Sequence, residues 1–82
     1  MGKKELNIVD VLNAISSIMS NVELAKEADI NQIIIGHYKS GIQKMSKKRE
    51  IHIIDSIRRI AMHKIKNAEE ILKLTEKWKD LY

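Results

Sequence analysis

Apolar residues recur at intervals of three and four along most of this 82-residue chain, and no stretch alternates apolar and polar residues. A first run comprises Ile8, Val11, Leu12, Ile15, Ile18, Met19 and Val22. A later run comprises Ile51, Ile54, Ile57, Ala61, Ile65 and Ala68. This spacing places apolar side chains along one side of an α-helix, whereas a half-buried strand alternates. The sequence therefore predicts an all-α protein.

Capping residues indicate where the first two helices begin. Asn7 stands just before the first apolar run and is suited to be its N-cap. Ser20 and Glu23 have the spacing of a capping box, in which each side chain bonds the other residue's backbone N–H. We therefore expect the run from Ile8 to Val22 to be helical and a short second helix from Asn21 to Ala28.

The remaining helices follow from a turn and a long stretch without Gly or Pro. Asp29 marks a sharp turn, and Asn31 is expected to cap a third helix that ends at Gly41. A long fourth helix is expected from Met45. Asn67 and Glu70 repeat the capping-box spacing, so we expect a fifth helix there; one uninterrupted helix over 46–80 fits almost as well. The total is four to five helices.

Length and composition favour one small domain over residues 1–82, because short chains bury only about 60% of the surface that they expose when unfolded. The chain has no Cys, which excludes disulfides and Cys-liganded zinc sites and favours a cytoplasmic location. Its N-terminus has no continuous apolar run, so we expect neither a signal peptide nor a membrane span.

Charge is spread unevenly along the chain. Residues 39–66 carry nine Lys or Arg against two acidic residues, whereas the flanking segments 1–38 and 67–82 carry net charges of −2 and −1. Such a basic block suits a polyanionic partner, or it forms a solvated helix face.

The segment "NVELAKEADINQIIIGHYKSG", residues 21–41, resembles the helix-turn-helix of the Cro/lambda-repressor-like family. Ala25 occupies the place of the small residue over which the second helix packs, and Gln32 is common at the second position of the recognition helix. The apolar residues that hold the two helices together in the family correspond to Ile30, Ile35 and Tyr38. The chain departs from the family pattern at Asp29, where Gly is usual, and at Ile33 and Ile34, where polar residues are frequent.

The resemblance implies a DNA-reading surface and a phosphate-binding flank. The base-reading residues would be Asn31, Gln32, Ile33 and His37, whose side chains suit adenine edges and thymine methyl groups. The phosphate-binding residues would be Lys39, Lys44, Lys47 and Lys48. Ile34 is expected to be half-buried. The alternative is that Asn31 only caps its helix and that the lysines are only solvated.

By this resemblance the protein is a small sequence-specific DNA-binding transcriptional regulator, a homodimer that reads two half-sites of double-stranded DNA about 34 Å apart. The alternative is an interaction module or inhibitor that keeps the helix-turn-helix scaffold and binds a protein partner through its "QIII" surface.

No pattern indicates an enzyme, a cofactor or a metal site. His37, His52 and His63 are widely spaced, and none has a second ligand at metal-binding spacing. Neither a phosphate-binding glycine loop nor a nucleophile elbow is present.

The last apolar residues form a stripe at helical spacing. We expect Ile71 and Leu74 to pack on the protein's own core. Trp78, Leu81 and Tyr82 are candidates for a dimer interface, because large apolar and aromatic side chains are common at interfaces.

Overall fold

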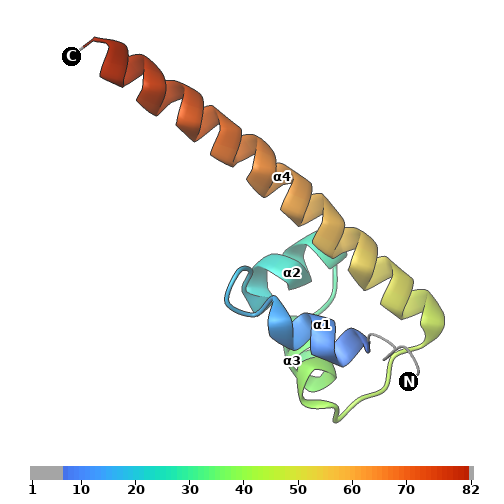
Figure 1. Ribbon diagram of the computed structural model, residues 1–82. Coiled ribbons are helices and arrows are strands. Elements are labelled where there is room, and N and C mark those ends of the chain that lie inside the picture. The colour runs from blue at the N-terminus through green and yellow to red at the C-terminus, as the bar shows by residue number, and fades with distance from the viewer. Residues whose placement is uncertain (1–6, 82) are drawn as a thin grey trace, which may run out of the picture.

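The computed structural model describes residues 7–81, and within that range it contains four α-helices and no strand (Figure 1). The helices are α1 (Ile8–Ala14), α2 (Asn21–Ala28), α3 (Gln32–Ser40) and α4 (Lys47–Asp80). Helices α1 to α3 gather against the N-terminal half of α4, while its C-terminal half extends beyond them (Figure 1). The all-α prediction is confirmed.

Every helix begins at a polar residue whose side-chain oxygen accepts a hydrogen bond from a backbone N–H of the first turn. The four bonds join Asn7 to Val9 N (2.8 Å), Ser20 to Glu23 N (3.0 Å), Asn31 to Ile33 N (2.8 Å) and Ser46 to Arg49 N (3.1 Å). These bonds satisfy N–H groups that have no partner within the helix. The predicted caps Asn7, Ser20 and Asn31 are confirmed.

The first helix is shorter than its apolar run suggested. It ends at Ala14, and the chain then turns. The hydroxyl of Ser16 donates a hydrogen bond to the carbonyl oxygen of Leu12 (3.0 Å), one of the local bonds by which serine competes with helical structure. The expectation that this helix continues beyond Ala14 was therefore wrong. Of the later residues in the run, Met19 is buried as expected, whereas Ile18 and Val22 are 64% and 59% exposed.

The long fourth helix is unbroken, and the expected break at Asn67 was wrong. Asn67 and Glu70 both lie inside α4, where nothing as disruptive as Gly or Pro interrupts the backbone. At 34 residues α4 is about 51 Å long and accounts for most of the 54 Å longest dimension. The radius of gyration is therefore 16.7 Å, against about 12 Å for a compact domain of this length.

The core lies where α2 packs against both α3 and α4, and where α1 packs against α3. Its buried apolar residues are Leu12, Met19, Leu24, Ala25, Ala28, Ile35, Tyr38, Ile53, Ile57 and Ile60. Ala25 and Ala28 bury small side chains on α2, which allows the neighbouring helices to approach closely. The expected core positions of Ala25, Ile35 and Tyr38 are confirmed, as is the half-burial of Ile34.

A chain of polar contacts fixes α4 against the end of α2. The ring Nε2 of His52 lies 2.6 Å from the carbonyl oxygen of Ala28 and donates to it. The hydroxyl of Ser56, which is fully buried, donates to the carbonyl oxygen of His52 (2.9 Å). Arg59 then donates to Ser56 Oγ (3.1 Å) and to a carboxylate oxygen of Glu27 (3.2 Å). These bonds hold α4 beside the turn that leads into α3.

Candidate nucleic-acid interface

The turn between α2 and α3 is made by a residue in the left-handed conformation. Asp29 has φ 56° and ψ 48°, and within residues 7–81 it alone among non-glycine residues has a positive φ. Asp tolerates this region better than most side chains do. The next residue, Ile30, donates its N–H to the carbonyl oxygen of Ala25 (3.0 Å) and packs against the core. The predicted turn at Asp29 is confirmed, and the apolar anchor after it sets the direction of α3.

Helix α3 has one buried side and one exposed side. Ile35 is 0% exposed and Tyr38 is 4% exposed, and both face the core. Gln32 and Ile33 lie on the other side, where Ile33 is 62% exposed. His37 follows Ile33 by one helical turn and is half-buried. The structure therefore brings Gln32, Ile33 and His37 together on one strip.

Asn31 lies at the start of this strip but already has a structural role. Its side-chain oxygen accepts the N–H of Ile33 as the N-cap of α3. Recognition of an adenine edge by an amide uses the oxygen and the nitrogen together. Gln32 is exposed and one methylene longer, which makes it the better placed of the two amides for such a contact.

Three residues that the sequence reasoning did not single out border the same strip. Ser40 is exposed one turn beyond His37, and its hydroxyl donates to the His37 carbonyl oxygen (3.1 Å). A Cβ at Gly36 would lie 4.0 Å from the side-chain nitrogen of Asn21, so the first residue of α2 lies beside the strip. Helical spacing from Gln32 would have found Gly36 and Ser40, whereas Asn21 is brought there only by the packing of α2 on α3.

Lys39 differs from the other lysines of the proposed flank. It is half-buried on α3, and burial lowers the pKa of its ammonium group below the ordinary value. Its carbonyl oxygen accepts a hydrogen bond from the side-chain nitrogen of Asn13 (3.0 Å), which ties α1 to the end of α3. Lys39 therefore lies at the edge of the domain's packed region.

The other three lysines divide between two shallow hollows. Lys44 and Lys47 line one hollow, between the chain that follows α3 and the start of α1. Lys48 lines a second hollow beside Asp29, Arg49 and His52, next to the turn that precedes α3. Arg49, which the sequence reasoning passed over, adds a cation there.

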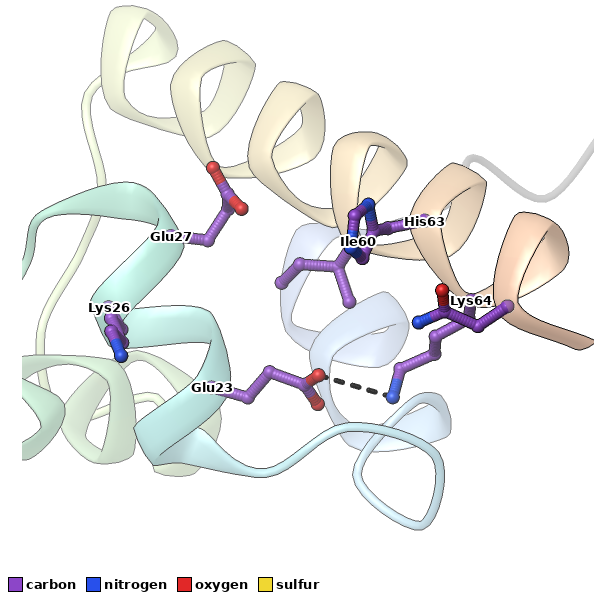
Figure 2. Close-up of a pocket in the computed structure, with 7 residues that line it drawn as sticks. Glu23, Lys26, Glu27, Ile60, His63 and Lys64 are labelled. Carbon is purple, nitrogen blue, oxygen red and sulfur yellow. Dashed lines mark ion pairs between the residues drawn. The ribbon is translucent and has the colours of Figure 1, made fainter.

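A third hollow, between α2 and α4, contains both acidic and basic side chains (Figure 2). Its lining includes Glu23, Lys26, Glu27, His63 and Lys64. The carboxylate of Glu23 lies 3.1 Å from the ammonium nitrogen of Lys64, and Figure 2 shows this ion pair bridging the two helices. With two carboxylates in its lining, this hollow is unsuited to a polyanion.

Of the candidate dimer residues, Trp78 lies on the part of α4 that projects beyond the domain, and Leu81 directly follows this helix. Trp78 is 59% exposed and Leu81 is 76% exposed, while Tyr82 lies outside the described residues. Ile71 and Leu74 are 61% and 59% exposed, so the expectation that they pack on the protein's own core was wrong. The reason is the unbroken α4, which carries them away from the other helices.

Comparisons with protein-family models, with curated proteins and with solved structures found no match to this chain. Among residues 7–81, no helix is both long and apolar enough to span a membrane. The same part of the chain contains no group of three His, Cys, Asp or Glu side chains placed to hold a metal ion.

Proposed function

We propose that α2 and α3 form a helix-turn-helix unit of the Cro/repressor type and that the protein is a small sequence-specific DNA-binding transcriptional regulator. Three features support this assignment: the left-handed Asp29 between the helices, the anchor Ile30, and the buried Ala25 against which α3 packs. Only residues 29–31 separate the two helices, as a tight helix-turn-helix requires.

The observation that carries the proposal is the exposed strip of α3. An α-helix with its side chains is about 10–12 Å wide and enters the major groove of DNA, which is about 12 Å wide. Gln32 can bond an adenine edge through its amide, and Ile33 can pack on a thymine methyl group. His37 lies one turn further along the same side and can bond a guanine or adenine acceptor.

Cations at both ends of the strip supply the contacts to phosphate. Lys44 and Lys47 lie near the chain that leaves α3, and Lys48 and Arg49 lie near the turn that enters it. Contacts of this kind fix the register of the protein on the duplex and provide most of its affinity, whereas base contacts provide specificity. The net charge of +4 also favours binding to the negatively charged duplex.

The proposed regulator is a binding protein rather than an enzyme, acts in the cytoplasm and needs no cofactor. It reads double-stranded DNA as a homodimer, because one recognition helix contacts too few bases to select a site within a genome. Its surface for pairing is the projecting part of α4.

The second candidate is a protein that binds another protein through α3, and exposed Ile33 is the observation in its favour. The apolar surface is smaller than the run "QIII" suggested, because Ile34 is half-buried and Ile35 is fully buried. A single exposed isoleucine between Gln32 and His37 suits contact with base edges in the major groove better than contact with a broad apolar surface of a protein.

Selection from a pool of randomised duplexes of about 30 base pairs tests the proposal. The full chain should enrich a defined sequence, and Gln32→Ala should relax the preference at one position within it. Lys73→Ala is the matched control, because Lys73 lies on the projecting part of α4, and it should enrich the same sequence as the parent. If no sequence is enriched at low salt, the DNA-binding proposal is wrong and the protein-binding alternative is favoured.

A further inference from the structure

One apolar seam along α4 is buried at its N-terminal end and exposed at its C-terminal end. The seam, which advances by four and three residues in turn, comprises Ile53, Ile57, Ile60, Lys64, Asn67, Ile71, Leu74, Trp78 and Leu81. This alternation is the a and d pattern of coiled coils. Ile53, Ile57 and Ile60 lie in the core, whereas the last four members are 59% to 76% exposed.

The domain ends where the seam becomes polar. Lys64 pairs with Glu23 of α2, and every described residue after Lys64 is exposed. The stretch from Ile65 to Asp80 therefore projects alone over about 24 Å. An isolated helix of this length gains little stability from its own backbone bonds, and most helical stability in proteins comes from packing an apolar side.

We propose that a second copy of this chain covers the exposed seam, with the two α4 helices running antiparallel. The first reason is steric. By heptad spacing, Ile71 and Leu74 lie on the same side of α4 as Ile53, Ile57 and Ile60, which are buried against the domain. The domain packs on the N-terminal half of α4 (Figure 1). In a parallel pair both domains would compete for the space between two helix axes about 8–10 Å apart. In an antiparallel pair the domains lie at opposite ends.

The second reason is charge. Glu70 and Lys77 directly precede the seam residues Ile71 and Trp78, and such flanking positions select coiled-coil orientation. When Ile71 faces Leu74 of the partner subunit in an antiparallel pair, Glu70 lies beside Lys77 of the partner subunit, and symmetry repeats this contact. In a parallel pair Glu70 would face Thr75 of the partner subunit, and the charges would not meet.

The register also explains Asn67, one of the two polar members of the seam. It places Asn67 opposite Trp78 of the partner subunit, near the end of the overlap. A single asparagine in a seam is known to fix register and orientation at some loss of stability. Asn67 also lines the hollow between α2 and α4, so the end of the partner's helix would reach the edge of the domain.

The overlap is about five helical turns long, which places its area at the low end of protein interfaces and predicts association that depends on concentration. Measured along the helices, the two domains would lie roughly 46 Å apart, which exceeds one turn of duplex. The pairing itself requires no DNA. Only the comparison of this spacing with half-sites on DNA rests on the proposed function.

Charge reversal tests both the partner and the orientation. Sedimentation equilibrium of the full chain should show a monomer–dimer equilibrium, and Glu70→Lys or Lys77→Glu alone should raise the dissociation constant about tenfold by placing like charges together. The double variant should return it to near the parent value. Glu69→Lys and Glu76→Lys, on the opposite side of α4, should leave the dissociation constant within about twofold of the parent value.

A second variant separates pairing from folding. Trp78→Ala combined with Leu81→Ala should give a monomer whose helicity by circular dichroism stays close to the parent, since both side chains lie outside the core. The proposal is overturned if the parent stays monomeric at high concentration, if the double charge variant fails to restore pairing, or if the single reversals have no effect. DNA binding by a monomeric parent would overturn the pairing and leave the proposed function standing.

Discussion

Ile33 and Ile35 stand two residues apart on α3, yet their side chains face opposite environments: Ile33 is 62% exposed and Ile35 is 0% exposed. The helix therefore presents one apolar side chain to a partner and another to the core. Two substitutions with the same chemistry can distinguish these roles.

Ile35→Ala should destabilise the fold by about 2–5 kcal/mol, because it removes buried methylene groups and leaves a cavity. Ile33→Ala should change the free energy of unfolding by less than about 0.5 kcal/mol, because that side chain is mostly in water already. Urea denaturation of both variants measures the two effects. A large loss of stability from Ile33→Ala would show that Ile33 is a structural residue and remove it from the reading surface.

Gln32→Ala should weaken binding to a selected duplex by about 1–3 kcal/mol and should leave binding to a random duplex unchanged. The reason is that base contacts discriminate sequences, whereas phosphate contacts do not. Fluorescence anisotropy with the two duplexes measures the difference. Equal losses on both duplexes would exclude Gln32 from base reading.

Asp29→Gly should stabilise the protein by about 0.5–1 kcal/mol, because glycine has no Cβ to disfavour a φ of 56°. Asp29→Ala is the matched control and should be less stable than the parent, since alanine tolerates the left-handed region less well than aspartate does. The midpoints of urea unfolding should therefore fall in the order Gly, Asp, Ala. An alanine variant as stable as the glycine variant would contradict this explanation of the turn.

The sequence was sufficient for features that local chemistry determines. The caps Asn7, Ser20 and Asn31 depend on one side-chain oxygen and a neighbouring backbone N–H group. The turns at Asp29 and Gly41 depend on a single residue that tolerates a positive φ, so all five could be predicted without the fold. The early end of α1 was missed because the apolar spacing continues through a segment whose serines favour a turn.

Two errors about α4 have a common cause. A capping-box spacing at Asn67 is compatible with a helix start, but it does not force one when the backbone can continue. A stripe such as Ile71 and Leu74 looks the same whether it is covered by its own core or by another chain. Which of the two covers the stripe depends on the size and position of the domain, and neither can be read from the spacing of apolar residues. The same limit applies to Asn21, which reaches the strip on α3 only through tertiary packing.

Salt dependence of duplex binding tests the central claim most directly. If Lys44, Lys47, Lys48 and Arg49 each neutralise one phosphate, affinity for a random duplex of about 30 base pairs should fall about a hundredfold between about 50 mM and about 200 mM salt. Lys44→Ala and Lys48→Ala should each reduce the slope by about 0.9, whereas Lys73→Ala should leave it unchanged. A duplex affinity that does not change with salt concentration, or no binding at about 50 mM salt, would contradict the assignment of this protein as a DNA-binding regulator.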